Sequence, residues 1–275
     1  MRRRLVGGAL RRYRENMGYA LEDAARVLEC DRSKISRIET GQRGIRPKEL
    51  RELLSEYGVP DSEQAALVGL VRRGGGHGWW DQYANELPEA FGDYLIMESA
   101  AAEIMMYEAQ LVPDLLQTAG YARAVASAAP GYQTDGQRDL AVAAKLARQE
   151  AILGGGARLS ILIGEAALRQ EVGGPEVMAA QITRLAEVIR DLPSVTLQVL
   201  PFSAGAHAAA GSASLAILRF PGAPSLGVVY LEAMSGGVYL EGQVDVANYI
   251  RAFALVRAAA LAATDTERLL REWAG

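Results

Sequence analysis

Cysteine is nearly absent from this sequence, which has one, Cys30, among 275 residues. A single cysteine excludes a disulfide within the chain and favours a reducing compartment. There are also only two histidines, and no cysteine and histidine have zinc-ligand spacing, so we expect neither a metal nor another cofactor. The Ala/Leu-rich run "FALVRAAALAA" is interrupted by Arg257 and is too short to cross a bilayer. The basic start has no uninterrupted apolar core of the kind a signal peptide needs. We therefore expect a cytoplasmic protein with no membrane partner.

The charges that are present are unevenly distributed. Residues 1–51 hold 14 Lys and Arg against 7 Asp and Glu, whereas the rest of the chain holds 15 against 26. A basic end on an acidic body is typical of a module that meets a polyanion while the remainder stays away from it. Uneven surface charge without any partner explains the charge count equally well. The sequence motifs are therefore needed to distinguish between these two interpretations.

Five short amphipathic stretches follow one another at the N-terminal end. We expect helices over residues 8–17, 21–28, 32–40, 47–57 and 65–73, because each has apolar residues at helical spacing and most are bounded by Gly or Pro. The second and third are separated by a turn of three residues. Short helices joined in this way predict a helix-turn-helix.

The third stretch, "DRSKISRIETG", has the composition of a helix that reads DNA. Ile35 and Ile38 supply a buried stripe, and Asp31 can cap the helix through its carboxylate. The outward positions carry long cations and short hydroxyls, which are the side chains that reach base edges and phosphates.

Residues 10–46 resemble the Xre family of phage-repressor-like helix-turn-helix regulators, through "LRRYRE", "AARVL" and "SKISRIETG". The resemblance implies binding to double-stranded DNA and an ion pair between Arg14 and Glu39. We also expect a homodimer on a two-fold site, because one helix-turn-helix covers too few base pairs to find a single site in a genome. The side chains it implies at the bases are Arg32, Ser33 and Arg37. Those expected at phosphates, including the basic loop and the next helix, are Lys34, Ser36, Arg43, Arg46 and Lys48. Three positions depart from the family. Glu29 stands where the turn normally has glycine, so a residue with a side chain has to adopt positive φ, and Ala20 replaces a capping hydroxyl. Cys30 takes a position usually held by valine, where we expect a buried small hydrophobe rather than a redox sensor.

A glycine-rich joint, "GGGHG" at 74–78, separates the head (residues 1–73) from a second domain (79–275). Within residues 79–128, apolar residues recur at intervals of three and four residues, which predicts helices. Strands are expected over 158–164, 195–200, 212–220, 226–233 and 237–242, with helices between and after them. We therefore expect an α+β protein, in which an all-α five-helix head precedes an α/β domain with a mixed sheet of about five strands.

The second domain resembles the uncharacterised domain that follows the head in many actinobacterial regulators of the WhiJ type. The resemblance rests on "VPDLLQTAGYARA", "ARQEAIL", "GEAALRQEVGG" and "VVYLEA". It implies a small protein partner encoded by a neighbouring gene. These motifs contain four polar residues that either line an effector pocket or form a buried polar network: Tyr121, Arg123, Arg148 and Glu165. We favour the buried network. Glu98, Glu103 and Glu108 are five apart, which places them on different helix faces and predicts solvated surface or capping.

The sequence favours a sequence-specific transcription regulator whose C-terminal domain binds a small partner protein or effector that tunes DNA binding. The alternative is an antitoxin-like interaction module with secondary DNA binding. An enzyme is a third possibility, which we do not expect. Ser203 and His207 are the nearest approach to a nucleophile and base, but no acid to orient the histidine can be named.

Overall fold

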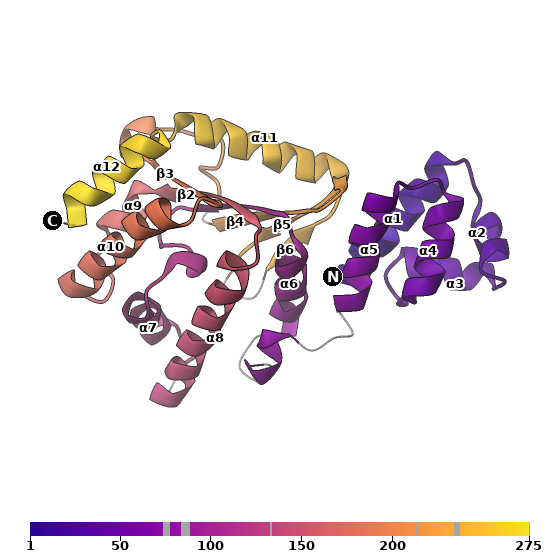
Figure 1. Cartoon of the computed structure of the whole chain (residues 1–275), viewed down its shortest axis with the longest axis horizontal. Helices are drawn as coiled ribbons and strands as arrows, with labels where there is room; N and C mark the ends of the chain where they lie inside the picture. Colours follow the sequence, from indigo (N-terminus) through magenta and orange to yellow (C-terminus); the bar gives the residue numbers. More distant parts are fainter. Residues whose placement is uncertain (74–77, 84–88, 133, 213, 234–236, 275) are drawn as a thin grey trace.

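We describe a computed structural model of the chain at residues 1–73, 78–83, 89–132, 134–212, 214–233 and 237–274 (Figure 1). The fold is α+β, as predicted: a helical head precedes a domain built around a mixed sheet. The head consists of α1 (Arg2–Asn16), α2 (Leu21–Val27), α3 (Arg32–Glu39), α4 (Pro47–Glu56) and α5 (Asp61–Arg73).

All five predicted head helices are present, but α1 begins at Arg2, six residues before the predicted start. Leu5 and Val6 are buried, so the apolar face of α1 extends to the N-terminal side of Gly7 and Gly8. Gly7 is required there by packing, because a Cβ at this position would lie 2.3 Å from the Ile38 carbonyl oxygen of α3. Asp31 precedes α3 as expected, but its side chain makes no capping hydrogen bond.

The second domain alternates helices and strands after the short 3-10 helix η1 (Trp79–Tyr83). Its elements are α6 (Glu89–Ala100), β1 (Glu103–Glu108), η2 (Asp114–Leu116), α7 (Ala119–Ala128), α8 (Asp135–Leu153), β2 (Arg158–Gly164), α9 (Glu165–Arg169), α10 (Pro175–Asp191), β3 (Val195–Leu200), η3 (Phe202–Ala204), β4 (Ser214–Phe220), β5 (Ala223–Leu231), β6 (Val238–Leu240), α11 (Gln243–Ala259) and α12 (Ala263–Ala274).

The described residues form one sheet of six strands, in the order β3-β2-β1-β4-β5-β6. Strands β1, β2 and β3 are parallel to one another, whereas β4, β5 and β6 pair antiparallel to their neighbours. The five predicted strands are all present, but the sixth, β1, was wrongly predicted as helix. Residues Ile104–Tyr107 of β1 are buried on both faces, so the strand has no polar alternation that would distinguish it from a buried helix.

Helices cover both faces of the sheet (Figure 1). Ile104, Met106 and Ile161 belong to the larger apolar core, which also takes in buried residues of α6, α8 and α10. Met105, Tyr107 and Leu162 belong to a smaller core on the other face, with residues of α11. The period of two along each strand therefore assigns alternate side chains to two separate layers.

The head packs directly against the second domain. Helix α5 contacts α6 and β5, and the Ser62 hydroxyl donates a hydrogen bond of 3.3 Å to the Gly222 carbonyl oxygen in the β4–β5 turn. Arg4 of α1 lies 2.6 Å from Glu241, which follows β6. Residues 74–77 of the predicted joint lie outside the described residues; immediately after them, η1 packs on α8. Buried residues of the head and of the sheet belong to one apolar core.

Within the described residues, no single helix is long and apolar enough to cross a membrane. Among the helices that the structure describes, only α11 and α12 taken together meet the requirements of length and composition, and they are bent by 60° at the break between them.

Candidate functional site

The proposed base-reading residues lie on the exposed face of α3. Arg32, Ser33 and Arg37 are all exposed, while Ile35 and Ile38 are buried beneath them. Arg32 donates a hydrogen bond of 3.0 Å to Glu22 of α2, and the Arg37 Nε atom donates one of 3.1 Å to the Ser33 carbonyl oxygen. Both arginines are thus held by weak surface contacts, which a base edge or phosphate can replace.

The proposed phosphate-contacting residues divide into two groups. Arg43, Arg46 and Lys48 are exposed around the loop and the start of α4, as phosphate contacts require. Lys34 instead points back into the head, where its Nζ atom lies 2.6 Å from Glu49. Hydrogen bonding from Lys34 lowers the pKa of Glu49 despite partial burial. Ser36 is half-buried. The structure therefore leaves Arg43, Arg46 and Lys48 exposed and pairs Lys34 with a carboxylate of the head.

The ion pair predicted between α1 and α3 is present and buried. The Arg14 Nε and Nη2 atoms donate hydrogen bonds of 2.7 and 2.9 Å to the two oxygens of Glu39. The Arg14 Nη1 atom donates a third hydrogen bond, of 2.6 Å, to the Tyr19 carbonyl oxygen. The side chains of Arg14 and Glu39 are 8% and 5% exposed, and hydrogen bonding to Glu39 raises the pKa of Arg14. This pair joins α3 to α1 inside the head.

The turn between α2 and α3 contains a strained residue. Glu29 has φ of +47°, as the substitution of a turn glycine predicts, and no other non-glycine residue in the described part of the chain has positive φ. Replacing Glu29 by Gly should raise the free energy of unfolding by about 0.5–1 kcal/mol, because relief of left-handed strain exceeds the entropy that glycine adds to the unfolded chain. Urea denaturation measures this change. As a control, Gly18→Ala at φ of +71° should destabilise the chain, and a destabilised Glu29→Gly variant would contradict the strain.

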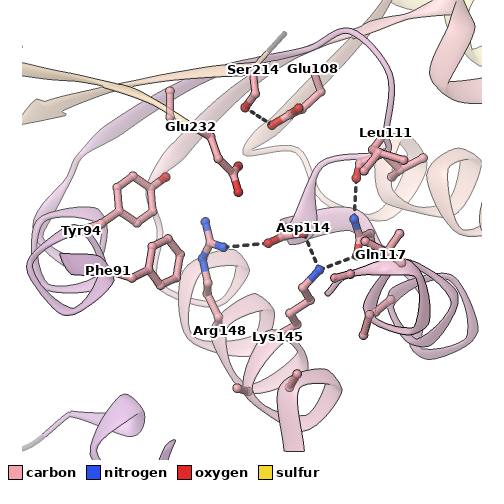
Figure 2. A pocket seen from close by; sticks show the side chains of 18 of the residues that line it. Phe91, Tyr94, Glu108, Leu111, Asp114, Gln117, Lys145, Arg148, Ser214 and Glu232 are labelled. Carbon is pink, nitrogen blue, oxygen red and sulfur yellow. Dashed lines mark hydrogen bonds and ion pairs between the residues drawn. The ribbon is translucent and has the colours of Figure 1, made fainter. Parts of the chain in front are cut away.

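A second candidate site is a pocket of about 760 Å³ on the α8 side of the sheet (Figure 2). Its walls are mostly small apolar side chains of α7 and α8: Ala122, Val125, Ala126, Ala129, Ala141, Val142 and Ala144. Aromatic side chains of η1, α6 and β5 close another side: Trp79, Phe91, Tyr94 and Tyr230. A mostly apolar cavity of this size with a few polar groups is typical of small-molecule sites.

The floor of the pocket is built by the register of three neighbouring strands. Met106 of β1 pairs with Ala216 of β4, which pairs with Tyr230 of β5. Two residues along each strand, Glu108 pairs with Ser214, and Glu232 directly follows the last residue of β5. All six side chains line the pocket, so it has one apolar row and one polar row.

Two cations of α8 lie in the pocket, and each is bound by carboxylates of the chain. Arg148 donates two hydrogen bonds of 2.7 Å to Glu98 of α6, and its guanidinium carbon lies 5.4 Å from the ring centres of Phe91 and Tyr94. Lys145 donates one of 2.8 Å to Asp114. Burial alone would raise the pKa of Asp114, but the charges of Lys145 and Arg148 bring this pKa below its usual value.

Glu108 and Glu232 lie beside these pairs without a cation of their own among the described residues. Glu108 accepts a hydrogen bond of 2.6 Å from the Ser214 hydroxyl. Burial raises the pKa of Glu108 to about 8, and the neighbouring Glu232 adds to the shift. Burial also raises the pKa of Glu232, although solvent reaches this side chain. In Figure 2 the Glu232 carboxylate points into the space above Arg148 and Asp114.

Of the four residues suggested for an effector pocket or network, the structure places one in the pocket, Arg148. Tyr121 is a buried residue of α7 that does not line the pocket, and its hydroxyl accepts a hydrogen bond of 3.1 Å from the Val112 amide. Arg123 is an exposed partner of Asp139. Glu165 begins α9 and accepts hydrogen bonds from the Phe202 amide and from Arg169. These contacts give Tyr121 and Glu165 structural roles away from the pocket.

The prediction that Glu98, Glu103 and Glu108 are solvated or capping residues was wrong. Glu98 is 1% exposed and paired with Arg148, and Glu103 lies 2.9 Å from Arg219 of the neighbouring strand. Only Glu98 lies in a helix, so helical spacing did not apply to the other two. Assigning residues 103–108 to a strand would have placed Glu108 on the same face as Met106. This placement would have identified Glu108 as a candidate for the pocket.

Two models of known families match separate parts of the chain. Residues 91–272 match the family described as "Domain of unknown function (DUF5753)", and residues 5–67 match a helix-turn-helix domain. Because the first match covers more than half of the chain, the chain belongs to the DUF5753 family. The helix-turn-helix domain makes it a DNA-binding regulator by class. No curated protein and no solved structure was found to match it.

Proposed function

We propose that this protein is a sequence-specific transcription regulator whose C-terminal domain binds a small partner protein or effector that tunes DNA binding. The exposed face of α3 carries the proposal: Arg32, Ser33 and Arg37 project from a helix held rigidly by the Arg14–Glu39 pair. The assignment to Xre-type regulators, and within them to the actinobacterial WhiJ type, is part of the same proposal. So is a cytoplasmic location, where a regulator meets its promoter.

A homodimer is the expected form on DNA, because one helix-turn-helix covers too few base pairs to find a single site in a genome. The proposal places the dimer surface on the second domain. Helix α5 of the head is a less suitable surface, because it already packs against α1, α4, α6 and β5. The second domain then has a binding role rather than a catalytic one, and its protein partner is expected from a neighbouring gene.

Replacing Arg37 by Ala should weaken binding to the preferred duplex by about 1–3 kcal/mol and relax the preference at one base position, because a base-edge contact is lost. Replacing Lys48 by Ala should instead weaken binding to all duplexes alike and reduce the salt slope by about 1, since a phosphate contact releases one counterion. Selection of duplexes from a random library, followed by binding titrations at several salt concentrations, measures both effects.

The matched control is Arg190→Ala, which removes the same charge from an exposed position on α10 of the second domain. It should leave affinity and preference unchanged. An Arg37→Ala variant that keeps the wild-type base preference would show that α3 is not the reading helix. The antitoxin-like alternative would gain support if the chain co-purified with the small protein of an adjacent gene and bound no duplex selectively.

A further inference from the structure

The pocket lies where the strand order of the sheet reverses, from β3-β2-β1 on one side to β4-β5-β6 on the other. Strand β1 has a parallel neighbour, β2, on one side and an antiparallel neighbour, β4, on the other. Glu108 ends β1, and Glu232 follows the end of β5, so both carboxyl groups lie at the same edge of the sheet. In open α/β sheets, ligands bind outside the carboxyl ends of the strands at such reversals.

The formal charges around the pocket leave an excess of carboxylates. Arg148 and Lys145 are engaged by Glu98 and Asp114, as described above. Glu108 accepts from a neutral hydroxyl, and Glu232 has neither a hydrogen bond nor an ion pair with any described residue. The chain therefore supplies two carboxyl groups at the floor of a largely apolar cavity that no cation of the described residues contacts by a hydrogen bond or ion pair. Arg148 acts on both only through its charge.

The remaining lining limits the kind of cation that can enter. No three His, Cys, Asp or Glu side chains in the described part of the chain are grouped so that they could hold a metal ion. The walls are instead methyl groups of α7 and α8 together with the rings of Trp79 and Tyr230, which attract organic cations through their faces. A volume of about 760 Å³ accommodates a drug-sized molecule.

We propose that this pocket binds a small organic cation, in which an ammonium or guanidinium group contacts Glu108 and Glu232 and an apolar body fills the space between α7 and α8. The inference rests on the proposed function and deepens it by naming the chemical class of the effector. Helix α6 offers a contact route to the head, because its Phe91 and Tyr94 line the pocket while the same helix packs against α5.

The test uses the full-length protein and benzyltrimethylammonium as a cationic probe, with phenylacetate as an anionic probe of similar size. Isothermal titration should show one site for the cation and no binding of the anion. The double variant Glu108→Gln/Glu232→Gln keeps the shape of both side chains and should lose about tenfold or more in affinity for the cation. Glu150→Gln, which removes a charge from an exposed position on α8 outside the pocket, should bind as the wild type does.

The pH dependence gives a second readout, because benzyltrimethylammonium has no proton to lose. The groups that face Glu108 are Glu232 after β5, Asp114 of η2, and Lys145 and Arg148 of α8. With a pKa of about 8, Glu108 has to release its proton before it can neutralise a cation, so affinity should rise about tenfold from pH 6.5 to 8.5. In Glu108→Gln this rise should be strongly reduced.

Absence of cation binding to the wild-type protein, or equal binding to the double variant, would overturn the inference. Stronger binding of phenylacetate would overturn it as well, since it would assign the pocket to anions. Because these titrations contain no DNA, their failure is separate from failure of the proposed function, which is judged by duplex binding without the probe. A probe that binds the pocket and changes duplex affinity supports both.

Discussion

Replacing Glu39 by Gln should lower the free energy of unfolding by about 3–5 kcal/mol, one of the two largest effects we expect in this protein. Arg14 and Glu39 are both almost fully buried, and two hydrogen bonds join them. The neutral amide can still accept one hydrogen bond, but it leaves the guanidinium charge without a counter-charge inside the head. Breaking a buried pair on one side is costly for that reason, even where the intact pair adds little stability.

Urea denaturation of the full chain gives the change in free energy. The matched control is Glu52→Gln, because Glu52 lies on the surface of α4 at 3.8 Å from Lys48, four residues earlier. Such an exposed pair contributes only about 0.3–0.5 kcal/mol, so the control should barely move the midpoint. Equal shifts for the two variants would show that the Arg14–Glu39 pair is open to solvent.

A loss of similar size should follow from Arg148→Met in the second domain. The Glu98 side chain is 0% exposed, and Arg148 is its cationic partner, with the Tyr94 hydroxyl donating a third hydrogen bond at 3.0 Å. Without Arg148 the carboxylate is left buried among aromatic rings. We expect a destabilisation of about 3–5 kcal/mol, measured again by urea denaturation.

The double variant Glu98→Leu/Arg148→Met distinguishes lost charge pairing from lost packing. It removes both charges and keeps apolar volume, so it should recover most of the stability that Arg148→Met loses. Arg123→Met is the control for arginine removal, because Arg123 is 44% exposed and pairs with carboxylates at the surface. A double variant that is less stable than Arg148→Met would mean that Glu98 is stabilised by something other than Arg148.

The head could be predicted from the sequence because its determinants are local. Ile35 and Ile38 lie one turn apart, Gly41 follows the end of α3, and Pro47 begins α4. Even the strain at Glu29 follows from one position in one turn. The ion pair of Arg14 and Glu39 was accessible only through the family resemblance, since nothing in the spacing of 25 residues indicates a contact.

The pocket could not be predicted in the same way, because strand register assembles it. Glu108 and Ser214 are 106 residues apart and meet only through the pairing of β1 with β4. That pairing was hidden by the assignment of β1 to helix, where Ile104 and Met105 fitted a helical stripe by coincidence. Without β1, Glu108 had no partner strand that would place it beside Ser214.

The contact between the head and the second domain has a practical consequence for protein engineering. A fragment cut after Arg73 would carry a complete helix-turn-helix, yet the side of α5 that packs on α6 and β5 would be open to water. Apolar surface uncovered in this way favours self-association. The head is therefore a poor interchangeable module: grafting it onto another protein requires either α6 as a companion or polar replacements on the uncovered side of α5.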